Sequence, residues 1–230
     1  MKMQSSSDAK IGILMLDTTF PRMKGDIGNP ATFPFPVMYK VIPGATVKRV
    51  VHEHDAALLE PFIEAAQELE AHGVQAITTS CGFLALFQKE IAAKVSVSFY
   101  SSSLLQVPLV YTVAGTGGSI GIITANQSSL SPRHITAAGI ADLPIHIAGM
   151  EECPSFRQSI LEGAAHLDKQ AIEEEIVQKA KEMKETHPDM KAIVLECTNM
   201  PPYRDRIKQD IQLPVFDIVT LTHYIYDALP

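Results

Sequence analysis

The stretch QAITTSCGF, residues 75–83, recurs 116 residues further on as KAIVLECTN, residues 191–199. In both copies an apolar run of strand length leads to a cysteine, Cys81 in the first copy and Cys197 in the second. A cysteine at the same place after both runs indicates that the chain is duplicated. This repeat decides the fold, because the sequence around each copy can then be aligned in one register.

The register continues on both sides of the cysteines. At the same shift, apolar residues 91, 95, 97, 99 and 100 correspond to apolar residues 207, 211, 213, 215 and 216. Ile11-Gly12-Ile13 likewise corresponds to Ile120-Gly121-Ile122, at a shift of 109. Loops of unequal length explain the difference between the two shifts. We therefore expect two related domains, residues 1–100 completed by a C-terminal helix at 217–230, and residues 101–216.

Short runs of Val, Ile and Leu alternate with longer stretches of helical period, which is typical of βα units on a parallel sheet. The predicted fold class is α/β, with two similar parallel-sheet domains related by a pseudo-two-fold axis and the active site in the cleft between them. We expect strands at residues 10–16, 37–42, 74–79, 95–99, 119–124, 143–148, 191–196 and 213–216.

Apolar stripes predict helices at residues 54–72, ended by Gly73, and at residues 172–186. Residues 17–36 differ from both, because they contain four prolines, two glycines and three phenylalanines without any period. A connection of this length and composition is typical of a lid or a binding loop.

Composition limits the classes of function. The 230 residues are 46% hydrophobic and 20% charged, with a formal net charge of −7, so the chain lacks the basic surplus that nucleic acid or anionic lipid surfaces require. The apolar run 11–16 is shorter than a signal-peptide core or a membrane span, which predicts a cytoplasmic protein. Three cysteines without a C-x-x-C pair favour free thiols over disulfides or zinc.

Each repeated cysteine stands between the carboxyl end of a strand and a helix start, where ligands bind in open α/β sheets. Backbone amides at a helix N-terminus bind carboxylates, and their positive potential is expected to lower the pKa of the adjacent thiol. Two thiols that face each other across a cleft can remove a proton from one side of a carbon and return it on the other. This arrangement predicts a racemase or epimerase.

The sequence resembles the aspartate/glutamate racemase superfamily, the cofactor-independent amino-acid racemases with hydantoin racemase, maleate isomerase and arylmalonate decarboxylase. The resemblance rests on residues 12–18 (GILMLDT), 43–44 (PG), 79–82 (TSCG), 120–124 (IGIIT) and 196–201 (ECTNMP). It implies that Cys81 and Cys197 are the acid/base thiols and that neither a metal nor another cofactor takes part. It also implies a homodimer and a small carboxylate substrate, such as aspartate or glutamate.

The resemblance further implies residues that bind the substrate. Hydroxyls or amides for its carboxylate are expected from Thr79, Ser80, Thr124 and Thr198, and Asp17 resembles the acidic residue at the end of the family's first strand. Gly82 and Asn199 join the candidates because they stand beside the motif cysteines, and Asn126 because it follows the first strand of the second half.

Two departures leave the substrate open. Glutamate racemases carry Asn-Thr after the first cysteine, where this chain has Gly82-Phe83, and His where it has Asn199. Phe83 either faces a less polar acid or belongs to the core, and Glu196 either orients a substrate amine or caps a helix. The alternatives to a racemase are a decarboxylase or cis–trans isomerase of the same superfamily, or a noncatalytic two-lobed protein that binds a small acid.

Two other features of the sequence do not indicate a functional site. His52-Glu53-His54-Asp55 lacks the H-x-H-x-D spacing of metal hydrolases and is interpreted as the start of a helix. Cys153 has no counterpart in the repeat, and we assign it no function.

Overall fold

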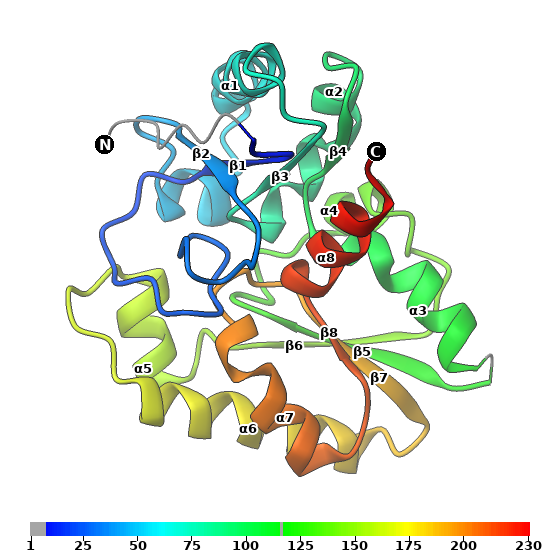
Figure 1. Ribbon diagram of the computed structural model, residues 1–230. Helices are drawn as coiled ribbons and strands as arrows, with labels where there is room; N and C mark the ends of the chain where they lie inside the picture. The colour runs from blue at the N-terminus through cyan, green and yellow to red at the C-terminus, as the bar shows by residue number, and fades with distance from the viewer. Residues whose placement is uncertain (1–7, 116) are drawn as a thin grey trace.

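The strands of the chain form two parallel sheets in the computed structural model, which describes residues 8–115 and 117–230. The first sheet has the order β2-β1-β3-β4 and the second the matching order β6-β5-β7-β8 (Figure 1). The strands are β1 (Ile11–Met15), β2 (Val37–Val41), β3 (Ala76–Thr79), β4 (Ser98–Tyr100), β5 (Ser119–Thr124), β6 (Ile145–Gly149), β7 (Met190–Leu195) and β8 (Val215–Phe216). Each overlaps a predicted run, and the predicted fold class is confirmed.

Helices cover both sheets. Those that follow β2, β3 and β4 are η1 (Lys48–His52), η2 (Ala56–Leu58), α1 (Leu59–Ala71), η3 (Gly82–Phe87), α2 (Gln88–Ala92), η4 (Ser103–Gln106) and α3 (Val107–Ala114). The remainder are α4 (Pro132–Ala137), α5 (Pro154–Phe156), η5 (Arg157–Leu161), α6 (Lys169–Thr186), η6 (Pro201–Tyr203), α7 (Arg204–Ile211) and α8 (Ile218–Ala228). Figure 1 shows α1 and α2 above the first sheet and α6 and α7 below the second.

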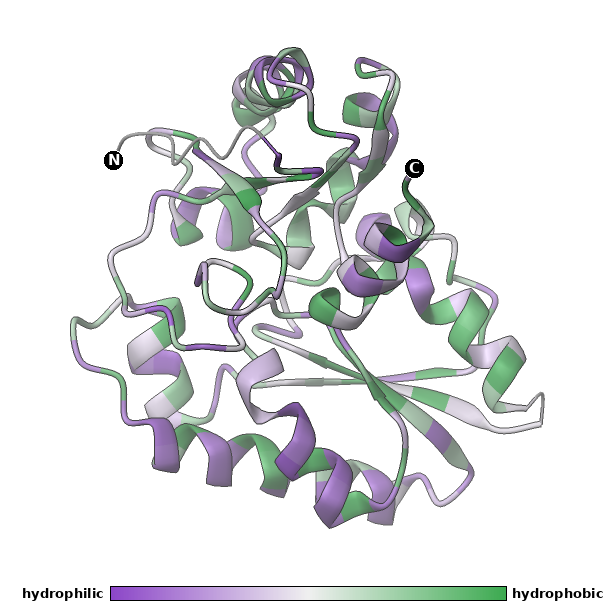
Figure 2. Cartoon of the chain, in the orientation of Figure 1, coloured by the Kyte–Doolittle hydropathy of each residue, from purple (hydrophilic) through white to green (hydrophobic). Residues whose placement is uncertain are grey.

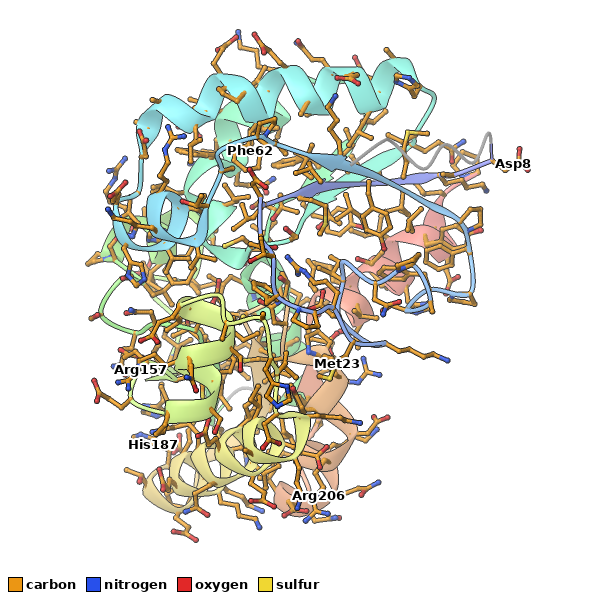
Figure 3. The ribbon with its side chains drawn as sticks, turned by 90° about the vertical axis from the view of Figure 1, so that its left-hand side faces the viewer. Asp8, Met23, Phe62, Arg157, His187 and Arg206 are labelled. Carbon is orange, nitrogen blue, oxygen red and sulfur yellow. The ribbon has the colours of Figure 1, made fainter. Side chains whose placement is uncertain are left out.

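The apolar stripes predicted at residues 54–72 and 172–186 are the buried faces of α1 and α6. Phe62 of α1 is fully buried and points toward the first sheet, whereas Arg206 of α7 points outward (Figure 3). Gly73 follows α1 with a φ of +90°, the left-handed conformation that favours glycine after a helix. α6 alternates between hydrophobic and hydrophilic residues (Figure 2), and its Ile172, Ile176 and Met183 are buried. Burial on one face explains why the period of α6 was readable from the sequence.

The C-terminal helix α8 returns to the first sheet. Ile218 and Val219 are buried in one cluster with Ile11 and Ile13 of β1. The side chain of Asp217 caps this helix by accepting the amide of Thr220 at 2.8 Å. This packing joins α8 to the first sheet. The predicted domain limits, with residues 217–230 assigned to the first half and with residues 1–7 outside the described part, stay a prediction.

Residues 17–36 form neither helix nor strand and run from β1 toward the other half of the molecule. Gly25, with a φ of +103°, lies directly against Pro202 of η6, so that a Cβ at this position would approach the Pro202 Cα to 2.9 Å. Phe20, Asp26 and Phe33 of this segment are buried. The segment is therefore packed against both halves, and we call it the 17–36 loop.

The longest helix, α6, carries a charged outer face. α6, at 18 residues, contains several lysines and glutamates. Among the helices of residues 8–115 and 117–230, none combines the length and the apolar character needed to cross a bilayer.

Candidate active site

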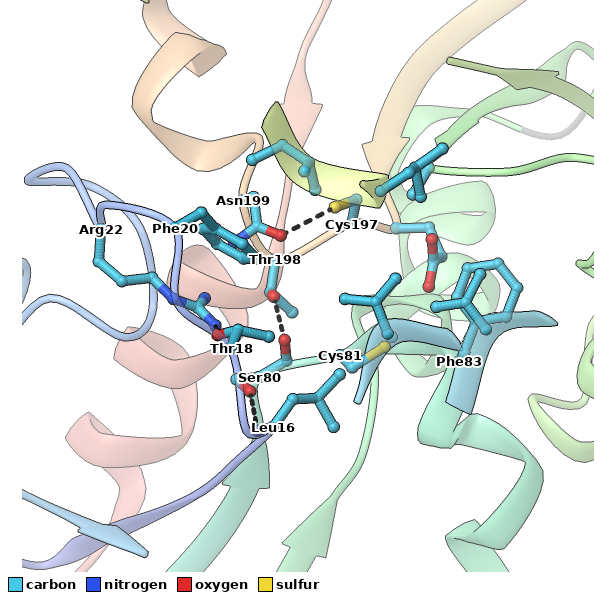
Figure 4. A pocket seen from close by; sticks show the side chains of 17 residues that line it. Leu16, Thr18, Phe20, Arg22, Ser80, Cys81, Phe83, Cys197, Thr198 and Asn199 are labelled. Atoms are coloured by element: carbon cyan, nitrogen blue, oxygen red, sulfur yellow. Dashed lines mark hydrogen bonds between the residues drawn. The ribbon is translucent and has the colours of Figure 1, made fainter. Parts of the chain in front are cut away.

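The fold brings the two repeated cysteines into one cavity between the sheets. Cys81 follows β3 and Cys197 follows β7, and both line the same space (Figure 4). Both side chains are largely buried, at 9% and 7% exposed. Aliphatic groups form much of the remaining wall, from Leu16, Val47, Val51, Ala125, Ile160 and Leu161.

A hydrogen bond joins the two halves directly beside the cysteines, and a second one joins two segments of the first half there. The hydroxyl of Thr198 donates to the carbonyl oxygen of Ser80 at 2.6 Å, and the hydroxyl of Ser80 accepts the amide of Leu16 at 2.9 Å (Figure 4). Each of these residues is adjacent to a cysteine or to the end of β1. The bonds therefore fix the position of one thiol relative to the other.

The 17–36 loop supplies a cation to the cavity. Arg22 lines it together with Thr18 and Phe20, and the guanidinium carbon lies 4.5 Å from the centre of the Phe20 ring. Arg22 donates to Asp26 at 3.0 Å and to the hydroxyl of Thr18 at 2.9 Å. A guanidinium has five N–H donors, so these two bonds leave donors for a carboxylate ligand.

A chain of hydrogen bonds connects this loop with Cys197. The thiol of Cys197 donates to Asn199 Oδ1 at 3.5 Å, and Asn199 Nδ2 donates to the carboxylate of Asp26 at 2.6 Å. Asp26 also accepts the amide of Gly28 at 2.7 Å. The loop thereby holds Asn199 in the orientation that places its carbonyl oxygen toward the thiol.

Glu196 is fully buried beside both cysteines. Its Oε2 accepts the hydroxyl of Thr124 at 2.8 Å, whereas its Oε1 has no hydrogen-bond partner within residues 8–115 and 117–230. Burial raises the pKa of Glu196 to about 7, while the bonds from Thr124 and the amide of Ala125 oppose this change. The carboxyl group of Glu196 accepts a hydrogen bond from the end of β5 and does not cap the helix that follows, so the helix-capping interpretation was wrong.

Burial also raises the pKa of both thiols, which corrects the expectation of a lowered pKa. The pKa of Cys81 rises to about 12 and that of Cys197 well above its ordinary 9.0, first because of burial and second because of the Glu196 charge. Arg22 acts in the opposite direction on Cys81. The sequence-based expectation was wrong because desolvation outweighs the amides that follow each cysteine.

Six of the candidate residues share the cavity: Ser80, Cys81, Gly82, Cys197, Thr198 and Asn199. The other four do not line it. Asp17 is exposed and accepts the amide of Gly44, Thr79 donates to the carbonyl of Ser101, and Thr124 donates to Glu196. Asn126 accepts from Ser128 and Ser129 within its own turn. Their roles in binding stay predictions, and in the structure they support the chain around the site.

Sequence reasoning did not select Arg22, Phe20 or Asp26, which lie in a loop without a period. Phe83, interpreted from the sequence either as a wall of the site or as a core residue, is both: it lines the cavity and is buried in the core. Asp55 caps η2, as expected of a helix start. In the described part of the chain no group of three or more His, Cys, Asp or Glu side chains is arranged to hold a metal ion.

Two α/β halves of equal strand order, with a cysteine from each in a shared cavity, define the architecture of the two-thiol racemases and their relatives. The sequence profile described as Asp/Glu/Hydantoin racemase matches residues 104–223. The chain belongs to this family. The fold agrees, because a glutamate racemase from Bacillus anthracis superposes with a TM-score of 0.62 at 15% identity, over 97% of this chain and 82% of that one.

More similar relatives carry the name of another reaction. A dimethylsulfoniopropionate lyase from Durusdinium sp. clade D is 33% identical over 92% of this chain and 72% of its own length. Dimethylsulfoniopropionate lyase 7 from Emiliania huxleyi is 31% identical over 95% of this chain and 67% of its own length. The prediction of a racemase, and of an isomerase as the enzyme class, is therefore wrong. Two thiols that line one cavity at equivalent strand ends do not by themselves determine which reaction takes place there.

Proposed function

We propose that this protein is a lyase that eliminates dimethyl sulfide from dimethylsulfoniopropionate and leaves acrylate. The observation that carries the proposal is the shared cavity of Cys81 and Cys197, in a chain similar to named dimethylsulfoniopropionate lyases. This substrate has a carboxylate at one end and a sulfonium group on its β-carbon. Removal of an α-proton then leads to loss of the sulfide, because the leaving group stands on the next carbon.

Arg22 supports binding of the carboxylate end. It lines the cavity from the 17–36 loop and has N–H donors beyond the two that Asp26 and Thr18 occupy. The aliphatic wall and the burial of the site strengthen such a charge-assisted contact, since water competes less for it.

Cys81 is the base in this proposal. Burial raises the pKa of Cys81 to about 12, but Arg22 opposes this increase, whereas the thiol of Cys197 donates its proton to Asn199. The Cys81 thiolate takes the α-proton, the electrons of that C–H bond form the double bond, and the C–S bond breaks with its electrons on the departing sulfide. The sulfonium charge of a bound substrate favours the thiolate, because a nearby positive charge lowers a thiol pKa.

Cys197 remains a thiol that lies against the reacting carbon. On substrate binding its proton turns from Asn199 Oδ1 to the substrate, where it stabilises the negative charge that develops next to the carboxylate. A single base is sufficient for elimination, so the two cysteines have unequal roles. This differs from a racemase, in which each thiol must give and take a proton.

The test is the release of dimethyl sulfide, measured in the headspace by gas chromatography, together with acrylate measured by NMR. We expect both products in equal amounts from the wild type. Cys81→Ala should reduce the rate by at least about a hundredfold, which is typical of a lost general base. Cys153→Ala is the matched control, because this partly buried thiol lies outside the cavity and its loss should leave the rate unchanged.

An unchanged rate in Cys81→Ala contradicts the assignment of the base. Absence of dimethyl sulfide with the folded wild type, under conditions in which a similar lyase is active, contradicts the proposed reaction itself.

A further inference from the structure

The unpartnered oxygen of Glu196 is the least satisfied group in the cavity wall. Glu196 is 0% exposed, and its Oε1 has no hydrogen-bond partner in the described chain. A buried carboxyl oxygen without a partner is costly, and such groups are normally paired. No lysine or arginine within residues 8–115 and 117–230 forms an ion pair with it.

Gly82 shows where this oxygen lies. A Cβ added to Gly82 would come within 2.1 Å of Glu196 Oε1 and 2.5 Å of the Glu196 carbonyl oxygen. Only a glycine therefore permits the carboxyl group to approach the segment between Cys81 and Phe83. The oxygen therefore lies against Gly82, the residue before Phe83. Figure 4 shows Phe83 on one side of the two cysteines and Arg22 and Phe20 on the other.

The cavity is thus polar along its length, with a guanidinium at one side and a carboxyl group at the other. We propose that Glu196 Oε1, together with the ring of Phe83, binds the positively charged group of the substrate. The inference rests on the proposed function for the identity of that cation, and it makes Glu196 the residue that selects a cationic over a neutral acid.

The chemistry of a sulfonium suits this pair. A sulfonium has no N–H to donate, so it is recognised by negative charge and by the faces or edges of aromatic rings. Phe83 is 2% exposed, lines the cavity and packs edge-on against His134, with ring centres 5.3 Å apart. Burial lowers the pKa of His134 to about 4, so this neighbour is neutral at pH 7 and adds no competing cation.

Two isosteric probes test the proposal without turnover. In 3-(trimethylammonio)propanoate the β-carbon carries a cation that leaves poorly, and in 4,4-dimethylpentanoate a neutral carbon replaces the nitrogen. Calorimetric titration gives the Kd of each probe for the wild type and for Glu196→Gln. We expect the wild type to prefer the cationic probe by at least about tenfold, as buried charge pairs do, and Glu196→Gln to lose that preference.

Binding of the neutral probe reports the folded state, and its Kd should change by less than about twofold in Glu196→Gln. Glu185→Gln is the matched control, because it removes the same charge from an exposed position on α6 and should retain the preference. Equal binding of the two probes to the wild type, failure of the cationic probe to bind, or a preserved preference in Glu196→Gln overturns the proposal.

The two proposals fail separately. A wild type that prefers the cationic probe but releases no dimethyl sulfide supports the cation site and refutes the lyase reaction. Release of dimethyl sulfide together with an unaltered preference for the cationic probe in Glu196→Gln supports the lyase reaction and refutes the cation site.

Discussion

Glu196 should make the stability of the protein decrease as the pH rises. Its pKa is raised from 4.5 to about 7 in the folded chain, so folded Glu196 holds its proton more tightly than unfolded Glu196 does. Unfolding therefore releases a proton between these two values. The resulting stability is fully present below pH 4.5 and is lost as the pH rises through 7.

The size of the effect follows from the two pKa values. One pKa unit corresponds to about 1.4 kcal/mol, so between pH 5 and pH 8.5 the free energy of unfolding should fall by about 2.5 kcal/mol through this group alone. Glu196→Gln has no proton to lose and should not show this component. The difference between the two proteins isolates Glu196, because all other groups titrate in both.

Urea unfolding at pH 5, 6, 7 and 8.5 measures this difference. The chain has no tryptophan, so far-UV circular dichroism is the suitable signal. With a urea m value of about 2 to 3 kcal/mol/M, the gap between the midpoints should change by about 1 M. A gap that stays constant from pH 5 to pH 8.5 refutes the reasoning, since the carboxyl group would then ionise as easily in the folded as in the unfolded chain.

Two further predictions concern the loop and the thiols. Asp26→Ala removes the carboxylate that accepts hydrogen bonds from Asn199 and Arg22. The variant should lose about 1 to 3 kcal/mol of unfolding free energy and show a raised KM in the dimethyl sulfide assay. Unfolding curves and kinetics that match the wild type contradict a role for the loop. Iodoacetamide at pH 7 should modify Cys153 before Cys81. Burial raises the pKa of both thiols, but Cys81 is buried and its pKa rises to about 12, whereas Cys153 is only partly buried. Peptide mass spectrometry that finds Cys81 modified as fast as Cys153 contradicts this order.

The sequence was informative wherever burial imposes a pattern. The strands are apolar runs because parallel strands are covered on both faces, and the repeat placed Cys81 and Cys197 at equivalent strand ends. The 17–36 loop has no such pattern. Its contact from Asp26 to Asn199 joins residues 173 apart, and no local signal specifies that pair. The lid or binding-loop interpretation gave the segment a general role but not the residues that reach the cavity.

The thiol pKa values show a second limit of sequence reasoning. The position of each cysteine after a strand suggested a positive potential from backbone amides. Whether a thiol is buried from water, however, depends on side chains from many segments. Val51, Ala125 and Ile160 come from three parts of the chain and bury the same space. Desolvation is therefore a property of the assembled cavity, and it reverses the direction expected from the local motif.

The departures from glutamate racemases have a consistent physical meaning in this cavity. Gly82 stands where those enzymes have an asparagine, and only its missing side chain allows Glu196 to lie against the segment beside Cys81. Phe83 stands where they have a threonine, so a hydroxyl that can hydrogen-bond a polar ligand is replaced by an apolar ring. An ammonium group needs acceptors for its N–H bonds, whereas a sulfonium needs charge and polarisable surface. Gly82 and Phe83, the two departures from the glutamate racemases, thus fit a cation that has no hydrogen-bond donors better than they fit an amino acid.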